Sequence, residues 1–462
     1  MKKALVFIDY DITIRHFIHS GVLKELESRY DVTYVFHTDS TSSKRTVHVD
    51  VAGLGLGRTR MLDVPRARLG AWYHLFIPSM LARHRGTSNY GPTLEQVAMN
   101  HTPKMVTAYR LLSQPGIRHA FIAGMKLRLG RYEPLERLLD EEKPDIVLHP
   151  SLLAGFFIND LMISCERRGV PLVVMMNSWD NPSNKAMSTG MPTKLVVWGP
   201  QTKKHAMQYL GMPEDRIEMF GAAQFEVYRE PVTESREELA CMFGVPADKP
   251  ILLYGGASKS LNETGHLRRL DAAIESGAIP PCHIIYRPHP WRGRLVAGEI
   301  SLFDAGLKNV TLDPHMAEFY RSVVTTPSPA LYLADYQVTR RLMALIDALV
   351  SPLSTILLEA AMHGKPALAL FVDAEPGSQG TRLLDVIGRL VYFAEFIDSE
   401  GILACDQIEQ LPEMVCQLMT MAGRPAVRDA LFHHADKYLD RSGPPYGARL
   451  ADLADRLTEG MP

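Results

Sequence analysis

Residues 344–371 read ALIDALVSPLSTILLEAAMHGKPALALF. The apolar run at 344–350 predicts a strand, the spacing at 355–363 predicts a helix, and 367–371 predicts a second strand. The hydroxyl residues before the helix can cap its start, and Gly364-Lys-Pro366 ends it. A strand, a helix and a strand in this order form a β-α-β unit, which requires a parallel sheet covered by helices.

The same alternation runs along most of the chain, and the fold class is therefore α/β. Strands are expected at 3–8, 32–36, 145–148, 171–176, 194–198, 251–254, 283–286 and 310–312, and helices at 14–30, 153–168, 202–210, 426–438 and 448–457. Residues 55–135 have no clean period and are expected to be an insertion. Thr233 is expected to cap a helix that ends at Gly244.

These elements predict two similar domains. We expect an N-terminal Rossmann-like acceptor domain at 1–225, a C-terminal Rossmann-like nucleotide-donor domain at 226–425, and final helices at 426–462 that return to the first domain. A chain of 462 residues is long enough for two or three cores.

Composition excludes several classes of protein. A hydrophobic fraction of 46%, a charged fraction of 22% and a net charge of -2 are typical of a folded protein with no general attraction to nucleic acid. The five cysteines have no metal-ligand or disulfide spacing, so no metal is expected. No stretch approaches the roughly 20 apolar residues of a membrane helix. We therefore expect a cytoplasmic protein, which can also associate peripherally with the inner face of the cytoplasmic membrane.

Two turns follow strands of the second domain. Tyr254-Gly-Gly-Ala-Ser-Lys-Ser260 offers the backbone of Gly255 and Gly256 and the side chains of Ser258 and Lys259 to a phosphate, although a plain loop has the same composition. Tyr286-Arg-Pro-His-Pro-Trp291 holds Arg287 and His289 rigidly between prolines, which suits a pyrophosphate. The alternative is a proline-rich turn with a surface histidine.

The third turn is Ser351-Pro-Leu-Ser-Thr355. Ser354 and Thr355 stand beside the first amides of the next helix and can help bind an anion. Glu359 lies about one turn further on, where a carboxylate can accept hydrogen bonds from ribose hydroxyls. A capped helix without a ligand is the alternative reading.

Together with Asp248-Lys-Pro-Ile-Leu-Leu-Tyr254, these motifs resemble the donor domain of CDP-glycerol glycerophosphotransferases and of related GT-B enzymes that build bacterial surface polysaccharides. The His-Pro and Ser/Thr pairs are also similar to those of bacterial sialyl- and Kdo-transferases with CMP-linked donors. The resemblance covers residues 140–370. It implies the GT-B architecture, with two parallel sheets facing across a cleft, donor phosphate on His289, Ser354 and Thr355, and ribose on Glu359.

The first domain is expected to bind the acceptor. Asn177-Ser-Trp-Asp-Asn181 resembles the interdomain part of the same transferases, which implies a cleft position for Ser178, Asp180 and Asn181. The loop Asp9-Tyr-Asp-Ile-Thr-Ile-Arg-His16 lacks a Gly-x-Gly-x-x-Gly fingerprint and therefore argues against a dinucleotide. Candidates for a general base or an acceptor contact are Asp9, Asp11, Arg15, His16, His19 and His149, with Asp11 and His16 preferred as catalytic residues beside His289.

The resemblance implies a metal-independent glycosyltransferase, or a polyol-phosphate transferase, with a CMP-, CDP- or UDP-linked donor and no separate cofactor. The acceptor is a glycan or a lipid-linked glycan. A hydrolysing sugar-nucleotide 2-epimerase is the alternative. Such an epimerase is expected to have a Ser-Gly-Gly turn before its second-domain helix, and the sequence Ser351-Pro-Leu-Ser-Thr355 at this place argues against it. A catalytically silent glycan-binding protein is an alternative of another class.

Overall fold

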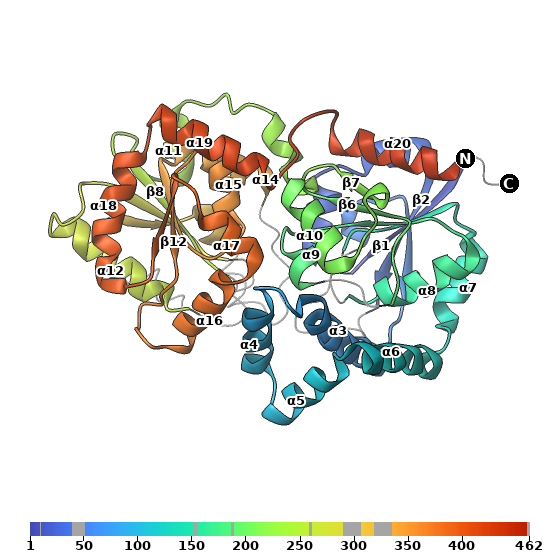
Figure 1. Cartoon of the computed structure of the whole chain (residues 1–462). Coiled ribbons are helices and arrows are strands. Elements are labelled where there is room, and N and C mark those ends of the chain that lie inside the picture. The colour runs from blue at the N-terminus through green and yellow to red at the C-terminus, as the bar shows by residue number, and fades with distance from the viewer. Residues whose placement is uncertain are drawn as a thin grey trace. The chain divides into compact units, whose positions relative to one another are not determined.

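The computed structural model describes residues 1–9, 11–38, 51–151, 155–185, 189–257, 261–289, 306–317 and 335–459, without the side chain of Asp11. The chain forms two compact units. The first comprises Met1–Glu226 together with Lys437–Pro462, and the second comprises Val227–Asp436. Each unit is built around one parallel sheet (Figure 1). The α/β class and the pair of parallel sheets predicted from the sequence are confirmed.

The sheet of the first unit has the strand order β3-β2-β1-β4-β5-β6-β7, and its neighbouring strands are parallel. The strands are β1 (Lys3–Ile8), β2 (Asp31–His37), β3 (Arg58–Leu62), β4 (Ile146–His149), β5 (Leu172–Met175), β6 (Lys194–Val197) and β7 (Ile217–Met219). Leu5, Phe7 and Leu148 are at most 1% exposed, as expected for strands covered on both faces. The chain order reverses between β1 and β4, which is the topological switch point.

Helices lie on both sides of this sheet; Figure 1 shows α20 on one side and α7 and α8 on the other. The described α-helices of this unit are α1 (Asp11–Thr13), α2 (Lys24–Arg29), α3 (Arg66–His84), α4 (Tyr90–Asn100), α5 (Pro103–Leu112), α6 (Pro115–Leu129), α7 (Glu133–Glu142), α8 (Ile158–Arg168), α9 (Asn181–Asn184), α10 (Pro200–Leu210) and α20 (Tyr446–Thr458). Short 3-10 turns are η3 (Ala52–Leu54), η4 (Glu214–Arg216) and η5 (Ala223–Arg229), the last of which continues into the second unit.

Two features of the first unit differ from the sequence prediction. The helix expected at 14–30 is a π-helix, η1 (Ile14–His19), followed by a break at Gly21, whose φ is +75°, and by α2. The segment 55–135 opens with an edge strand, β3, and continues as helices. β3 was missed because four of its five residues are exposed, so its sequence RTRML has no buried apolar face.

The sheet of the second unit has the order β10-β9-β8-β11-β12-β13 and is also parallel. Its strands are β8 (Ile251–Gly255), β9 (His283–Arg287), β10 (Val310–Leu312), β11 (Ala348–Pro352), β12 (Ala367–Leu370) and β13 (Ile402–Cys405). Leu252, Ile284 and Leu368 belong to one buried core cluster on this sheet.

The helices described in the second unit are α11 (Arg236–Phe243), α12 (Glu263–Glu275), α14 (Tyr336–Leu345), α15 (Ile356–Met362), α16 (Gln379–Gly388), α17 (Val391–Ile397), α18 (Leu411–Met421) and α19 (Pro425–Asp436), with the 3-10 turn η8 (Ile408–Gln410). The strand expected at 344–350 is in fact the end of α14 followed by β11. Leu345 and Ile346 are as buried as the strand itself, so an apolar run alone could not separate the two elements. Ser235, in a capping box with Glu238, starts α11, rather than Thr233.

The C-terminal segment divides between the units. α19 packs on α15, where a Cβ on Gly364 would overlap Arg428. The second unit ends at Asp436, and the first unit resumes at Lys437. α20 packs on α2, and the Tyr30 hydroxyl lies 2.9 Å from both Asp455 Oδ1 and Thr458 Oγ1.

Candidate functional site

The switch point of the second sheet lies between β8 and β11, and β9 adjoins β8 on its other side. The carboxyl ends of these three parallel strands meet at one edge, where open α/β sheets bind ligands. The Gly256 amide donates to the Arg287 carbonyl at 2.8 Å, and the Ser351 hydroxyl donates to the Gly255 carbonyl at 2.7 Å. The structure therefore brings the three turns predicted from sequence together.

Gly255 and Gly256 allow this close approach. A Cβ on Gly255 would lie 3.0 Å from Ile356 Cγ2, and one on Gly256 would lie 2.7 Å from Glu263 Oε2 and 3.0 Å from the His289 amide nitrogen. The two glycines are thus required by packing between the strand ends. Ser258 and Lys259, predicted in the same turn, lie outside the described residues.

Glu263 is a residue of this edge that the sequence interpretation missed. Its carboxylate is fully buried and accepts from the Ala257 amide at 2.8 Å and from the Tyr286 hydroxyl at 2.7 Å. It therefore ties the turn after β8 to β9. The signal in the sequence was the Asn262-Glu263 pair at a helix start, where Asn262 accepts from the Gly265 amide.

Arg287 supplies a buried positive charge at the end of β9. It is 7% exposed, and its Nε lies 3.4 Å from Oδ2 of Asp313, which is fully buried. Neither Nη atom of Arg287 has a hydrogen-bond partner among the described residues. Asp313 was also missed; it accepts the His315 amide at 3.0 Å and so anchors the turn after β10. Arg287 keeps donors that a bound anion can use.

His289, Ser354 and Thr355 are partly exposed at the same edge. Ser354 Oγ accepts from the Ile356 amide at 3.4 Å, while Thr355 is the N-cap residue of α15 without a side-chain capping bond. Ser351, which was quoted but not chosen as a site residue, is fully buried and bridges β11 to β8. The hydroxyls of Ser354 and Thr355 are therefore the ones at the surface of this turn.

Glu359 lies further along α15 and is already held by a neighbour. It accepts a hydrogen bond from the Tyr228 hydroxyl, and the Tyr228 ring packs edge-on against His363 with centroids 4.6 Å apart. His363 Nδ1 in turn lies 2.8 Å from the Glu359 carbonyl. The contact with Tyr228 fixes the direction of the carboxylate that the resemblance assigns to ribose.

A second cluster lies at the switch point of the first sheet. Asp9 follows β1 and His149 ends β4, and Asp9 Oδ2 lies 3.1 Å from His149 Nε2 with both side chains fully buried. A Cβ on Gly155 would overlap the Asp9 carboxylate, so only glycine fits there. The sequence suggested both side chains but did not pair them.

The contacts of His149 fix the orientation of its ring. The Nδ1 atom donates to the Ser151 carbonyl at 2.8 Å. The Nε2 atom therefore faces Oδ2 of Asp9, at 3.1 Å. The contact is not aligned as a hydrogen bond, and neither Asp9 oxygen has a hydrogen-bond partner in the described part of the chain. Such groups are concentrated at functional sites.

His16, a predicted catalytic base, is buried in the π-helix. Burial, with a smaller contribution from the neighbouring Arg15 charge, lowers the pKa of His16 to about 3, against a hydrogen bond to the Asn177 backbone that raises it. A base with such a low pKa is weak at neutral pH. Arg15 is partly exposed and His19 is exposed. Asp11 belongs to α1, but its side chain lies outside what the structure describes.

The turn that carries Ser178, Asp180 and Asn181 is bonded internally. Asp180 accepts from Asn181 Nδ2 at 2.9 Å and from Lys185 Nζ at 2.5 Å. Asn181 in turn accepts the Asn177 amide at 3.3 Å and donates its own amide to the Ser178 carbonyl at 3.1 Å. Asp180 and Asn181 are buried and hold the turn together, whereas Ser178 is partly exposed.

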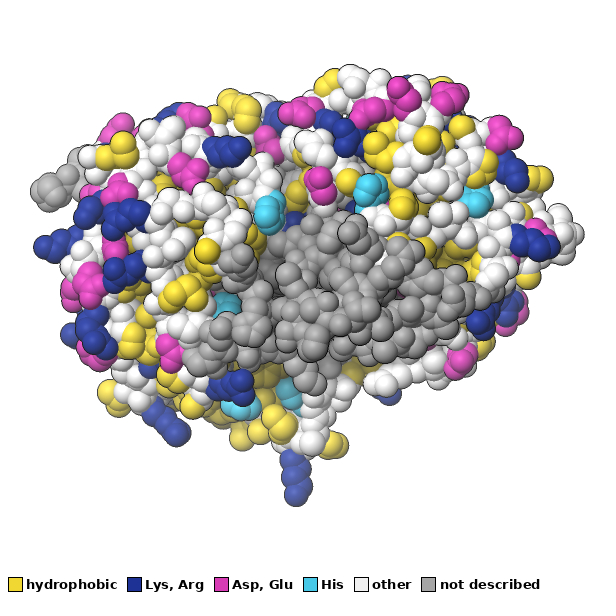
Figure 2. Space-filling model, turned by 180° about the vertical axis from the view of Figure 1, so that it is seen from behind, with side chains coloured by type: hydrophobic (Ala, Val, Ile, Leu, Met, Phe, Trp, Pro, Cys, Tyr) yellow, Lys and Arg dark blue, Asp and Glu magenta, His cyan; other side chains and the backbone are white. Residues whose placement is uncertain are grey.

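Over the described ranges, no group of three or more His, Cys, Asp or Glu side chains is arranged to hold a metal ion. Among the described helices, none combines the length and the apolar character that crossing a bilayer requires. On the face shown in Figure 2, Lys and Arg side chains are interspersed with Asp and Glu over much of the described surface.

Comparison with solved structures identifies the fold. The chain is similar to a Listeria monocytogenes protein described as a candidate UDP-N-acetylglucosamine 2-epimerase, with 11% identity, a TM-score of 0.53 and coverage of 100% of this chain and 98% of the other. It is similar to UDP-N-acetylglucosamine 2-epimerase from Rickettsia bellii at 13% identity, a TM-score of 0.52 and coverage of 99% and 98%. It is also similar to the Neisseria meningitidis UDP-GlcNAc 2-epimerase bound to UDP-GlcNAc, at 12% identity, a TM-score of 0.51 and coverage of 98% and 99%.

These similarities span the whole chain, and with the two parallel sheets they define the GT-B fold. No protein-family model matches the sequence. No curated protein matches it either.

Proposed function

We propose that the chain is a glycosyltransferase that moves a sugar from a nucleotide-activated donor to a growing surface polysaccharide or glycolipid. The observation that carries this proposal is the meeting of the Gly-Gly, Arg-Pro-His-Pro and Ser-Thr turns at the switch point of the second sheet. Fold similarity at this level of identity does not identify the reaction. The proposal rests instead on the charged and hydroxyl side chains at the switch points of the two sheets.

The second unit binds the donor in this proposal. The Arg287 guanidinium, the His289 ring and the hydroxyls of Ser354 and Thr355 bind the donor phosphates. Developing negative charge on the leaving phosphate is stabilised by cations and donors already held in place. Glu359, oriented by Tyr228, accepts hydrogen bonds from the ribose hydroxyls.

The first unit supplies the base. The Asp9 carboxylate takes the proton of the acceptor hydroxyl, and the acceptor oxygen forms a bond to the anomeric carbon. The bond between that carbon and the donor phosphate breaks, and its electron pair leaves with the nucleotide. His149 is a positioning residue, because its ring contacts the Asp9 carboxylate at 3.1 Å and fixes one side of it.

A donor assay tests the proposal. The purified chain is incubated with CMP-, CDP- and UDP-linked sugars, with and without glycan acceptors, and nucleotide release is measured together with the fate of the sugar. Transfer of the sugar to an acceptor is the expected result. Free sugar with inverted configuration at carbon 2 would instead identify a hydrolysing 2-epimerase.

The turnover of the His289→Ala variant tests whether His289 acts in catalysis. Loss of a preorganised charge-stabilising donor costs on the order of 10²-fold in turnover, and this variant should lose that much. Nucleotide binding without turnover of any donor by the wild-type protein would contradict the proposal and favour a catalytically silent protein with the same fold.

A further inference from the structure

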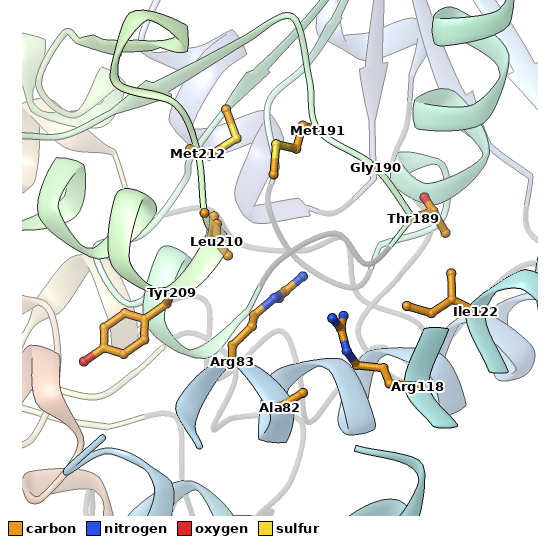
Figure 3. Close-up of a pocket in the computed structure, with 11 residues that line it drawn as sticks. Ala82, Arg83, Arg118, Ile122, Thr189, Gly190, Met191, Tyr209, Leu210 and Met212 are labelled. Atoms are coloured by element: carbon orange, nitrogen blue, oxygen red, sulfur yellow. The ribbon is translucent and has the colours of Figure 1, made fainter. Parts of the chain in front are cut away.

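The insertion of the first unit contributes to a pocket in that unit. Its volume is about 460 Å³, and it is lined by the end of α3, by α6, by the end of α10 and by the segment before β6. Figure 3 shows that the guanidinium groups of Arg83 and Arg118 both point into it. None of its lining residues belongs to either switch-point cluster.

The charge inside this pocket is of one sign. Two arginines and no acidic residue line it. The Nε atom of Arg118 is buried and has no hydrogen-bond acceptor among the described residues. Lys126, also on α6, donates to the Thr189 carbonyl at the pocket wall and adds a third cation nearby. An anion bound between two guanidinium groups that face one space reduces the repulsion between them.

The titration of Arg83 agrees with this geometry. Burial, with a smaller contribution from the charge of Arg118, lowers the pKa of Arg83 to about 10. The insertion as a whole is basic, since residues 66–131 contain ten lysines and arginines and one acidic residue, Glu95. At the lower edge of Figure 2, basic and histidine side chains lie among hydrophobic ones.

We propose that this pocket binds the phosphate group of a phosphate ester between Arg83 and Arg118. Arginine forks pair with phosphate through two parallel hydrogen bonds, and two of them match a dianionic group. The apolar wall formed by Ile122, Met191, Leu210 and Met212 covers the organic part of the ester. The site goes beyond the proposed donor and acceptor chemistry, because it needs neither switch point.

Calorimetric titration with two probes tests the site. Hexyl phosphate represents a lipid-like ester and glycerol 3-phosphate a soluble one. Tighter binding of hexyl phosphate assigns the pocket to a lipid-linked phosphate, and tighter binding of glycerol 3-phosphate assigns it to a soluble metabolite. Failure of the wild-type chain to bind either probe overturns the proposal.

Arg118→Gln should weaken binding of the preferred probe about tenfold or more, since a charge-assisted pair is lost. Arg128→Gln is the matched control, because Arg128 is an exposed residue of the same helix and the change in net charge is identical. Its affinity should stay within about twofold of wild type. Equal losses of affinity in the two variants would mean that binding depends on the net charge of the protein alone, and the proposal would then fail.

Stability without ligand separates binding from folding. Arg118→Gln removes a like-charged neighbour of Arg83 and should therefore not lower the melting temperature. Arg118→Lys keeps the charge but not the fork, and its affinity should lie between those of wild type and Arg118→Gln. Identical affinities in all three proteins would overturn the assignment, and they would leave the proposed donor site untouched.

Discussion

Asp9 is a buried carboxylate at the switch point of the first sheet. Burying a carboxylate with no exposed surface and no hydrogen bond among the described residues destabilises the fold, and the contact with His149 at 3.1 Å offsets only part of that cost. Replacing such a residue by a neutral one of the same shape should not harm the fold. A proton-accepting role explains why a carboxylate is kept there.

Asp9→Asn should therefore lower turnover by about 10²- to 10⁴-fold, the usual contribution of a general base. Nucleotide affinity should stay unchanged, because the donor is assigned to the second unit. Donor titration by calorimetry and steady-state rates with saturating acceptor measure the two quantities. Normal turnover in a folded Asp9→Asn protein would remove Asp9 from the mechanism.

Gly155→Ala tests the position of the same carboxylate without changing it chemically. The added methyl group would occupy the place of Asp9 Oδ2 and displace the carboxylate from His149. Turnover should fall at least tenfold, and the free energy of unfolding should drop by about 1–3 kcal/mol, as for other overpacked sites. Rates and urea unfolding curves provide the comparison.

Gly124→Ala is the control for that substitution. Gly124 lies inside α6, and a Cβ there meets no atom within 4 Å. This variant should keep full activity and gain about 0.5–1 kcal/mol of stability. If Gly155→Ala behaved like Gly124→Ala, the tight fit between Gly155 and Asp9 would be wrong.

Glu359→Gln should weaken nucleotide binding without slowing the chemical step, because Glu359 is assigned to the ribose and not to the reacting bond. The dissociation constant of the nucleotide should rise about tenfold, while the rate at saturating donor is kept. Glu413→Gln, an exposed residue of α18, makes the same change in charge and should have no effect. An unaltered nucleotide affinity in Glu359→Gln would leave Glu359 as a structural partner of Tyr228 alone.

At the scale of elements, the sequence predicted most of the parallel strands because they are buried apolar runs. It could not separate α14 from β11, since Leu345, Ile346 and Ala348 are all fully or almost fully buried. It also missed the π-helix at 14–19, where a regular apolar spacing does not reveal an extra residue per turn.

The candidate site was predicted only in part. Strand order places turns at one edge, so Arg287, His289 and Ser354 could be grouped from topology alone. The pairs Asp9 with His149 and Arg287 with Asp313 join residues far apart in the chain. Such partners depend on the packed structure, because many acidic residues of the sequence satisfy the same local pattern.

At the scale of the whole molecule, two buried histidines should make stability depend on pH. Burial lowers the pKa of His16 to about 3 and that of His84 to about 4. Below about pH 6.5 the unfolded chain binds protons that the folded chain does not, so stability falls as the pH falls. Between pH 7 and pH 5 each histidine should cost about 2 kcal/mol.

His84→Gln should remove its share of this acid sensitivity. Chemical unfolding of the variant and of the wild-type chain at pH 7 and pH 5 measures the difference, with all other titrating groups held in common. A loss of stability on acidification that is the same in both proteins would show that His84 does not stay neutral in the folded state.

The central claim is that the second unit binds a nucleotide-activated donor at the switch point between β8 and β11. A crystal structure of the chain with a bound nucleoside diphosphate tests it most directly. The phosphates are predicted to lie within hydrogen-bond distance of Arg287, Ser354 and Thr355, with the ribose against Glu359. A nucleotide bound instead against Asp9 and His149 would contradict the claim and reverse the roles of the two units.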